Sequence, residues 1–89
     1  MQAHVEDQLK QFIVDSYLFG DTTRMPGDSE SLLRAGVLDS TGVLELIEFL
    51  EAEFAITVED VETVPDNLDS IAGVVRFVAA KRHAGEGAA

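Results

Sequence analysis

The feature that most restricts the fold of this chain is a helical spacing of apolar residues between positions 43 and 54. These residues lie three or four positions apart: Val43, Leu46, Ile47, Leu50 and Phe54. Such spacing places side chains on one face of an α-helix. Asp39 and Ser40 stand directly before the pattern, and their side-chain oxygens can accept the unpaired N–H groups of a helix start. The sequence therefore predicts a helix from about Ser40 to Phe54.

Two further segments show the same spacing. One runs from about Ala3 to Leu18 and stops at Gly20, and the other follows a second capping pair, Asp69-Ser70. A short helical turn is expected at 59–62, before Pro65 interrupts it. We therefore predict an all-α fold, a small antiparallel helical bundle of three main helices and one short helix. Its predicted core contains Leu9, Phe12, Ile13, Val43, Leu46, Leu50, Phe54, Ile71, Val74, Val75 and Val78.

Residues 21–38 form a long connection for so small a domain, with Pro26-Gly27 as a turn pair. Such loops are usually functional or anchored by their own apolar side chains. The candidate anchors are Leu32, Leu33, Val37 and Leu38, and residues 29–34 are expected to form at most a short helical turn. At the other end of the chain, residues 85–89 are expected to be a flexible tail, which leaves residues 1–84 as the single domain.

Length and composition exclude several classes of protein. The 89 residues contain no apolar run of about 20 that could span a membrane and no signal peptide, so we expect a cytoplasmic monomer. There is no cysteine, so any thiol chemistry would need an attached group. The net charge of −11 argues against nucleic-acid binding, because neutralising phosphates requires Lys and Arg.

The acidic residues are unevenly distributed. Between Ala35 and Val75 there is no Lys or Arg, whereas ten Asp and Glu residues occur there. One interpretation is a well-solvated surface that keeps the protein in solution. The other is a docking surface for basic patches on partner proteins, with fast and salt-sensitive encounters.

Ser40 is poorly equipped to act as a nucleophile of its own. No Gly-x-Ser-x-Gly elbow surrounds it, and the two histidines, His4 and His83, lie near the chain ends. The sequence also lacks a phosphate-binding loop, zinc-ligand spacing and a calcium-loop pattern, so no metal site is predicted. Ser40 fits better as the acceptor in a reaction that another enzyme catalyses, and the start of its helix suits an anionic substituent.

The run from Gly36 to Gly42, Gly-Val-Leu-Asp-Ser-Thr-Gly, followed by Leu44-Glu45-Leu46, resembles the attachment signature of acyl carrier proteins. The resemblance extends from about Leu32 to Arg82, and the form of the motif is similar to stand-alone carriers and D-alanyl carriers. It implies that Ser40, next to Asp39, carries 4′-phosphopantetheine derived from coenzyme A. Acyl or aminoacyl intermediates would then be held as thioesters on this arm, and the protein itself would not be an enzyme.

The resemblance also implies partners. These are a phosphopantetheinyl transferase, an acyl- or aminoacyl-loading ligase, and a downstream synthase or transferase with basic docking patches. Helical spacing places Ser40, Leu44 and Glu48 on one face, with Glu45 and Glu51 beside them, and this is the predicted docking face. Thr41 and Gly42 are small and are expected to leave room for a partner to approach the serine; nothing in the sequence suggests a packing role for Gly42.

The chain departs from the carriers of type II fatty acid synthesis at three positions. Those carriers commonly have Leu-Asp after the serine and Met eight positions after it, whereas this chain has Thr41-Gly42 and Glu48. A specialised pathway, polyketide synthesis or an aminoacyl cargo therefore stays open beside fatty acid synthesis. The alternative hypothesis is an acidic helical interaction module without a prosthetic group.

Overall fold

The computed structural model describes the backbone of residues 2–88 and the side chains of residues 5–82. The described residues form α1 (Gln2–Tyr17), η1 (Thr22–Arg24), α2 (Ser40–Phe54), η2 (Asp60–Glu62), α3 (Pro65–Leu68) and α4 (Ile71–Ala88), where η marks a 3-10 turn. They contain no strand, so the predicted all-α fold is confirmed. None of these helices is both long and apolar enough to cross a membrane.

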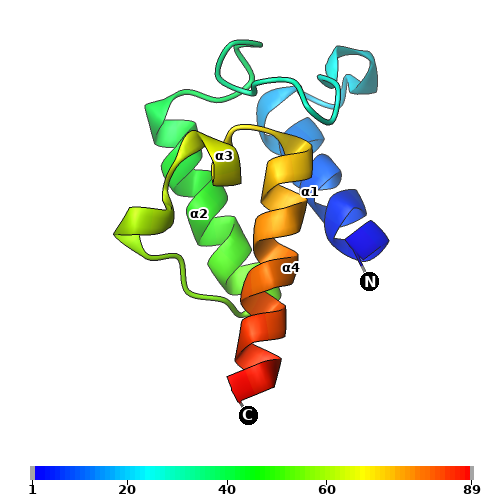
Figure 1. The fold of residues 1–89 in the computed structure, drawn as a ribbon. Coiled ribbons are helices and arrows are strands. Elements are labelled where there is room, and N and C mark those ends of the chain that lie inside the picture. Colours follow the sequence, from blue (N-terminus) through cyan, green and yellow to red (C-terminus); the bar gives the residue numbers. More distant parts are fainter. Residues whose placement is uncertain (1, 89) are drawn as a thin grey trace.

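The three long helices lie side by side (Figure 1). α1 runs in the opposite direction to α2 and α4, whereas α2 and α4 run the same way because residues 55–70 return the chain to the end of the bundle where α2 begins. The helical turn expected at 59–62 is η2, which ends before Pro65 as predicted, and Pro65 is the first residue of α3. α4 continues to Ala88, and the prediction of a flexible tail at 85–89 stays a prediction.

The core lies where α4 packs against α1, α2 and α3. Nine of the eleven predicted core residues are buried, and the other two, Phe12 and Val43, are half-buried against the same cluster. Leu46 is 0% exposed, which confirms the orientation predicted for α2. Phe77 lies off the apolar stripe that predicted α4, yet it is buried as well. The apolar spacing alone therefore identified most of the core.

Asp69 anchors the long loop to the start of α4. Its backbone carbonyl accepts a hydrogen bond from Leu32 N at 2.7 Å, and its carboxylate accepts bonds from Leu33 N at 2.9 Å and from the Ser31 hydroxyl. Leu32 is fully buried, whereas Leu33 is 45% exposed, so the prediction that Leu33 anchors the loop was wrong. The loop thereby holds the residues that precede Ser40 against the bundle.

Two buried glycines allow close approach between elements. A Cβ on Gly73 in α4 would lie 2.6 Å from the carbonyl oxygen of Asp66 in α3. A Cβ on Gly42 in α2 would lie 3.2 Å from Leu38 Cδ2 and 3.3 Å from Asp39 Oδ1. The expectation that Gly42 has no packing role and opens space for a partner was therefore wrong, because Gly42 faces the interior.

Candidate functional site

Ser40 is the first residue of α2 and is exposed to solvent. Asp39 precedes it in an extended conformation, and its carboxylate accepts a hydrogen bond from Gly42 N at 2.7 Å. The first bond of the helix joins Val43 N to Asp39 O at 2.9 Å. Within the described residues, the N–H groups of Ser40 and Thr41 donate to no protein group, which is the usual state of a helix start. The exposed serine thus stands beside N–H groups that can bind an anion.

Tyr17 connects the end of α1 to this start of α2. Its hydroxyl lies 2.6 Å from Glu45 Oε1 and 3.3 Å from Gly42 O, so it can donate to either acceptor. Burial of the phenol and its hydrogen bond to Glu45 raise the pKa of Tyr17 above the ordinary range. The hydroxyl therefore stays protonated at neutral pH and holds the first turn of α2 in place.

Most of the residues expected on the docking face are exposed along α2. Leu44 is 64% exposed, which is unusual for a large apolar side chain, and Thr41, Glu45 and Glu48 are exposed as well. Glu51 is different, because it is half-buried and its carboxylate accepts a hydrogen bond from Val58 N at 2.9 Å. The structure thus places Ser40, Thr41, Leu44, Glu45 and Glu48 on exposed α2 surface and gives Glu51 a structural role.

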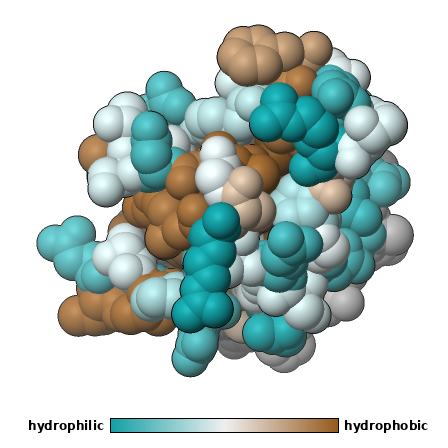
Figure 2. Space-filling model, turned by 90° about the horizontal axis from the view of Figure 1, so that it is seen from above, coloured by the Kyte–Doolittle hydropathy of each residue, from teal (hydrophilic) through white to brown (hydrophobic). Residues whose placement is uncertain are grey.

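A second apolar surface lies near this face and was not foreseen from the sequence. Val61 of η2 is 85% exposed, and Val64 is 41% exposed. Beside them is a small hollow of about 100 Å³, and its lining includes Leu33, Val43, Val64, Pro65 and Leu68. Figure 2 shows hydrophobic atoms on the side of the molecule where α2 and α3 lie. Helical spacing could not reveal this surface, because its residues come from α2, α3 and two connecting segments.

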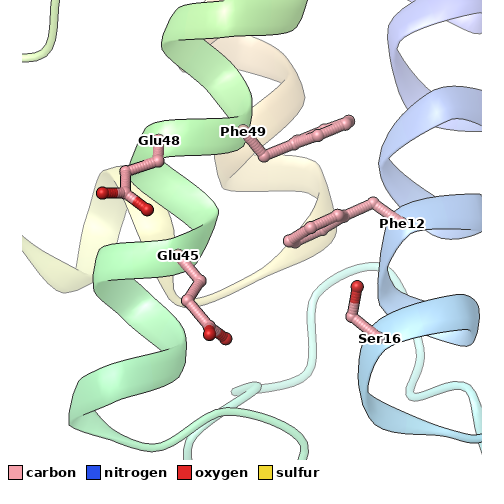
Figure 3. Close-up of a pocket in the computed structure, with 5 residues that line it drawn as sticks. All are labelled: Phe12, Ser16, Glu45, Glu48 and Phe49. Atoms are coloured by element: carbon pink, nitrogen blue, oxygen red, sulfur yellow. The ribbon is translucent and has the colours of Figure 1, made fainter.

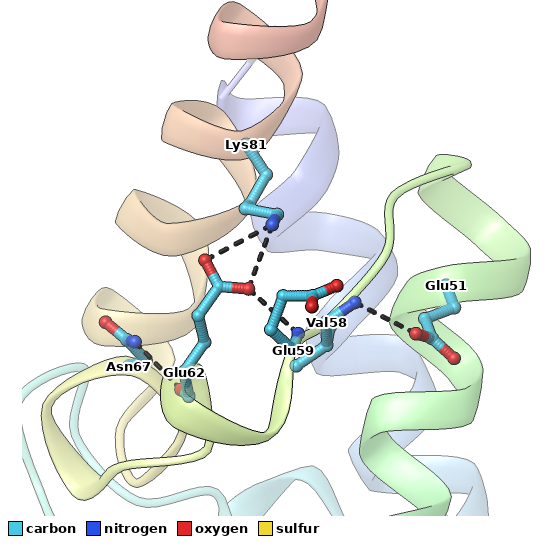
Figure 4. A network of polar contacts seen from close by, with 6 residues as sticks. All are labelled: Glu51, Val58, Glu59, Glu62, Asn67 and Lys81. Carbon is cyan, nitrogen blue, oxygen red and sulfur yellow. Dashed lines mark hydrogen bonds and ion pairs between the residues drawn. The ribbon is translucent and has the colours of Figure 1, made fainter.

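A polar network holds η2 next to α4 (Figure 4). The Lys81 ammonium lies 2.9 Å from Glu62 Oε1, and the same carboxylate accepts a bond from Glu59 N. These two contacts, the backbone bond first, lower the pKa of Glu62. Asn67 donates to the carbonyl of Glu62 at 2.9 Å. The network keeps η2, which carries the exposed Val61, next to α4.

The described side chains contain no cluster of three or more residues that could hold a metal ion. His4 and His83 lie outside the residues whose side chains are described. A comparison of the chain with models of known protein families finds no match, and neither does a comparison with curated proteins.

Proposed function

We propose that this protein is a cytoplasmic, monomeric carrier that holds acyl or aminoacyl intermediates on a 4′-phosphopantetheine arm attached to Ser40. The observation that supports this proposal best is the position of Ser40. It is exposed at the first residue of α2, directly after the Asp39 cap, and the N–H groups of Ser40 and Thr41 are free to bind an anion. A phosphodiester on Ser40 would find its negative charge favoured there by the helix dipole.

The attachment reaction transfers a group and needs no catalysis by this chain. A phosphopantetheinyl transferase would move the phosphopantetheine group of coenzyme A to Ser40 Oγ. The serine O–P bond forms, the pyrophosphate bond of coenzyme A breaks, and the hydroxyl proton leaves with adenosine bisphosphate. The arm would supply the thiol that this cysteine-free chain lacks. Tethering a thioester in this way raises its effective concentration at each enzyme that the carrier visits.

Leu44 and the carboxylates around it form the proposed docking face for the transferase and for the loading and downstream enzymes. Glu45 and Glu48 would steer basic patches, while Leu44 would provide an apolar contact that loses its water on binding. Exposed charge pairs contribute only about 0–1 kcal/mol each. Leu44→Ala should therefore slow phosphopantetheine transfer more than Glu48→Gln does, and high salt should slow transfer to both.

The direct test is incubation with a broad-specificity phosphopantetheinyl transferase and coenzyme A, followed by intact mass measurement. We expect the wild type to gain the mass of one phosphopantetheine group and Ser40→Ala to gain none. Ser29→Ala is the matched control, because Ser29 is exposed in the loop outside the site. Absence of a gain on the wild type, or an equal gain on Ser40→Ala, would refute the carrier function.

The second candidate is an acidic helical interaction module without a prosthetic group. It is favoured by the same excess of acids between residues 35 and 75. In this case the wild type would stay unmodified under the conditions above, yet would still bind basic partners in a salt-dependent way. The mass measurement therefore separates the two candidates.

A further inference from the structure

An open groove runs between α1 and α2, next to the Leu44 docking face, with which it shares Glu45 and Glu48. It consists of two adjoining hollows of about 580 Å³ and 400 Å³. Phe12 and Ser16 of α1 and Phe49 of α2 line both hollows, so they form one continuous surface. In the following, the α1–α2 groove means these three residues together with Asp15, Glu45, Glu48 and Glu53, which also line it.

The floor of the groove is aromatic. Phe12 and Phe49 point toward each other from the two helices (Figure 3), with ring centroids 4.2 Å apart and planes 10° from parallel. Both rings are half-buried. α1 and α2 each pack against α4, whereas α1 and α2 do not pack closely against each other. The stacked rings fill the space between them and leave an apolar surface open to solvent.

The rim of the groove is acidic. Asp15 lies on α1, whereas Glu45, Glu48 and Glu53 lie on α2, and among the residues with described side chains no Lys or Arg lines either hollow. Glu53 and Asp15 accept hydrogen bonds from Gln8 and Gln11, while Glu48 has no hydrogen bond or ion pair within the described residues. Its carboxylate is therefore fully available to a cation from outside.

An aromatic floor between two acidic edges is complementary to one kind of surface. The long stems of Lys and Arg lie along apolar surfaces while their charged ends stay in water or next to carboxylates. An amphipathic helix with apolar residues on one side and basic residues at its edges would match both features. A second copy of this chain would not, because its net charge is −11 and a symmetric contact would bring the acidic rims together.

We propose that the α1–α2 groove, which adjoins the Leu44 face, binds a basic amphipathic helix of a partner protein. The partner helix would pack on Phe12 and Phe49 and place basic side chains next to Glu48 and Glu53. Glu45 and Glu48 border both surfaces, because they line the groove and also stand next to Leu44 on the exposed surface of α2. The inference does not depend on the phosphopantetheine arm, so it can be tested on the unmodified chain.

The test titrates the isotope-labelled full chain with a synthetic helical peptide that carries Leu on one side and Arg and Lys at its edges. We expect the largest NMR shift changes at Phe12, Ser16, Glu48 and Phe49. A peptide of the same composition in an order that forms no apolar face should bind at least about tenfold more weakly. Raising the salt concentration should weaken binding of the amphipathic peptide, because the rim charges are exposed.

Ser16→Arg is the decisive variant. Ser16 is exposed in the groove near the end of α1, and its side chain makes no hydrogen bond to any residue in the described part of the chain. Arg is a good helix former and suits a position near a helix end. Its added charge and bulk should weaken peptide binding by about tenfold. Ala80→Arg is the matched control, since Ala80 is exposed on α4 and outside the groove, and it should weaken binding by no more than about twofold. Glu48→Gln, which keeps the shape of the side chain, should weaken it by about two- to fivefold.

Several results would overturn the proposal. One is absence of peptide binding at low salt, and another is equal weakening by Ser16→Arg and Ala80→Arg, which would mean attraction by net charge alone. A third is a set of shift changes centred on Leu44, Val61 and Val64 instead of the groove. If sedimentation shows that the wild type is a dimer and that Ser16→Arg dissociates it, then a second copy of the chain occupies the α1–α2 groove. None of these results depends on modification of Ser40, so a failure here is distinguishable from a failure of the carrier function.

Discussion

Replacing Gly73 by Ala should destabilise the protein, although Gly73 lies in the first turn of a long helix. Helix propensity alone predicts the opposite, because Ala is favoured over Gly in a helix interior by about 1 kcal/mol. In the folded chain, however, the new Cβ would lie 2.6 Å from the backbone carbonyl oxygen of Asp66 and 2.9 Å from Ser70 Oγ. The carbonyl oxygen belongs to the backbone and cannot turn away, and Ser70 Oγ can turn away only by losing its hydrogen bond with Gly73 N.

The size of the effect follows from these contacts. Inserting a methyl group into a packed site typically costs about 1–3 kcal/mol. Ser70 Oγ accepts a hydrogen bond from Gly73 N at 3.0 Å, and losing such a cap costs about 1 kcal/mol. Subtracting the gain in helix propensity, about 1 kcal/mol, leaves a net loss of about 2 kcal/mol. For a domain of this size that corresponds to a fall in Tm of about 10 °C.

The measurement is urea and thermal unfolding followed by circular dichroism. The control variant is Ala80→Gly, because Ala80 is exposed on the same helix and should report helix propensity alone, with a loss of about 1 kcal/mol. If Gly73→Ala is as stable as the wild type or more stable, while Ala80→Gly loses stability as expected, then α3 and α4 do not approach as closely as described.

The other predictions concern three single residues. Leu46→Ala removes a fully buried side chain and should cost about 2–5 kcal/mol in urea unfolding; a loss below about 1 kcal/mol would contradict its place in the core. Phe19 has a left-handed backbone with φ of 54° and is 89% exposed, so Phe19→Gly should raise the free energy of unfolding by up to about 1 kcal/mol. A lower free energy of unfolding for Phe19→Gly in urea unfolding would contradict this prediction. Because the pKa of Tyr17 is raised in the folded state, its contribution to stability is complete below about pH 10 and falls as the pH rises further. Above about pH 10, the free energy of unfolding of Tyr17→Phe should fall less with pH than that of the wild type. If the free energy of unfolding falls equally with pH in both proteins, the result would argue against the contact between Tyr17 and Glu45.

The sequence was sufficient to predict the three long helices and most of the core, but not α3. α2 begins at Ser40 and ends at Phe54, as expected from the Asp39 cap and the apolar spacing. Both signals act between residues at most four positions apart, so they operate whatever the rest of the chain does. The candidate site could be predicted to the same extent, because Ser40 and Leu44 owe their positions to α2 alone.

Only the tertiary structure decides which side chains are available to a partner and which are used in contacts within the fold. Nothing in the sequence distinguishes Glu51 and Asp69 from the other acidic residues. In the structure, the Glu51 carboxylate accepts a hydrogen bond from Val58 N, and the Asp69 carboxylate accepts one from Leu33 N, 36 positions away in the chain. A Cβ on Gly42 would crowd Leu38 and Asp39, a Cβ on Gly73 would crowd Asp66 of α3, and the floor of the α1–α2 groove is formed by Phe12 stacked on Phe49. The Leu33–Asp69 bond and the Phe12–Phe49 stack join residues far apart in the chain, and the other contacts depend on how the connecting segments fold back onto the helices. Local spacing carries no information about such contacts, because they depend on how whole helices pack.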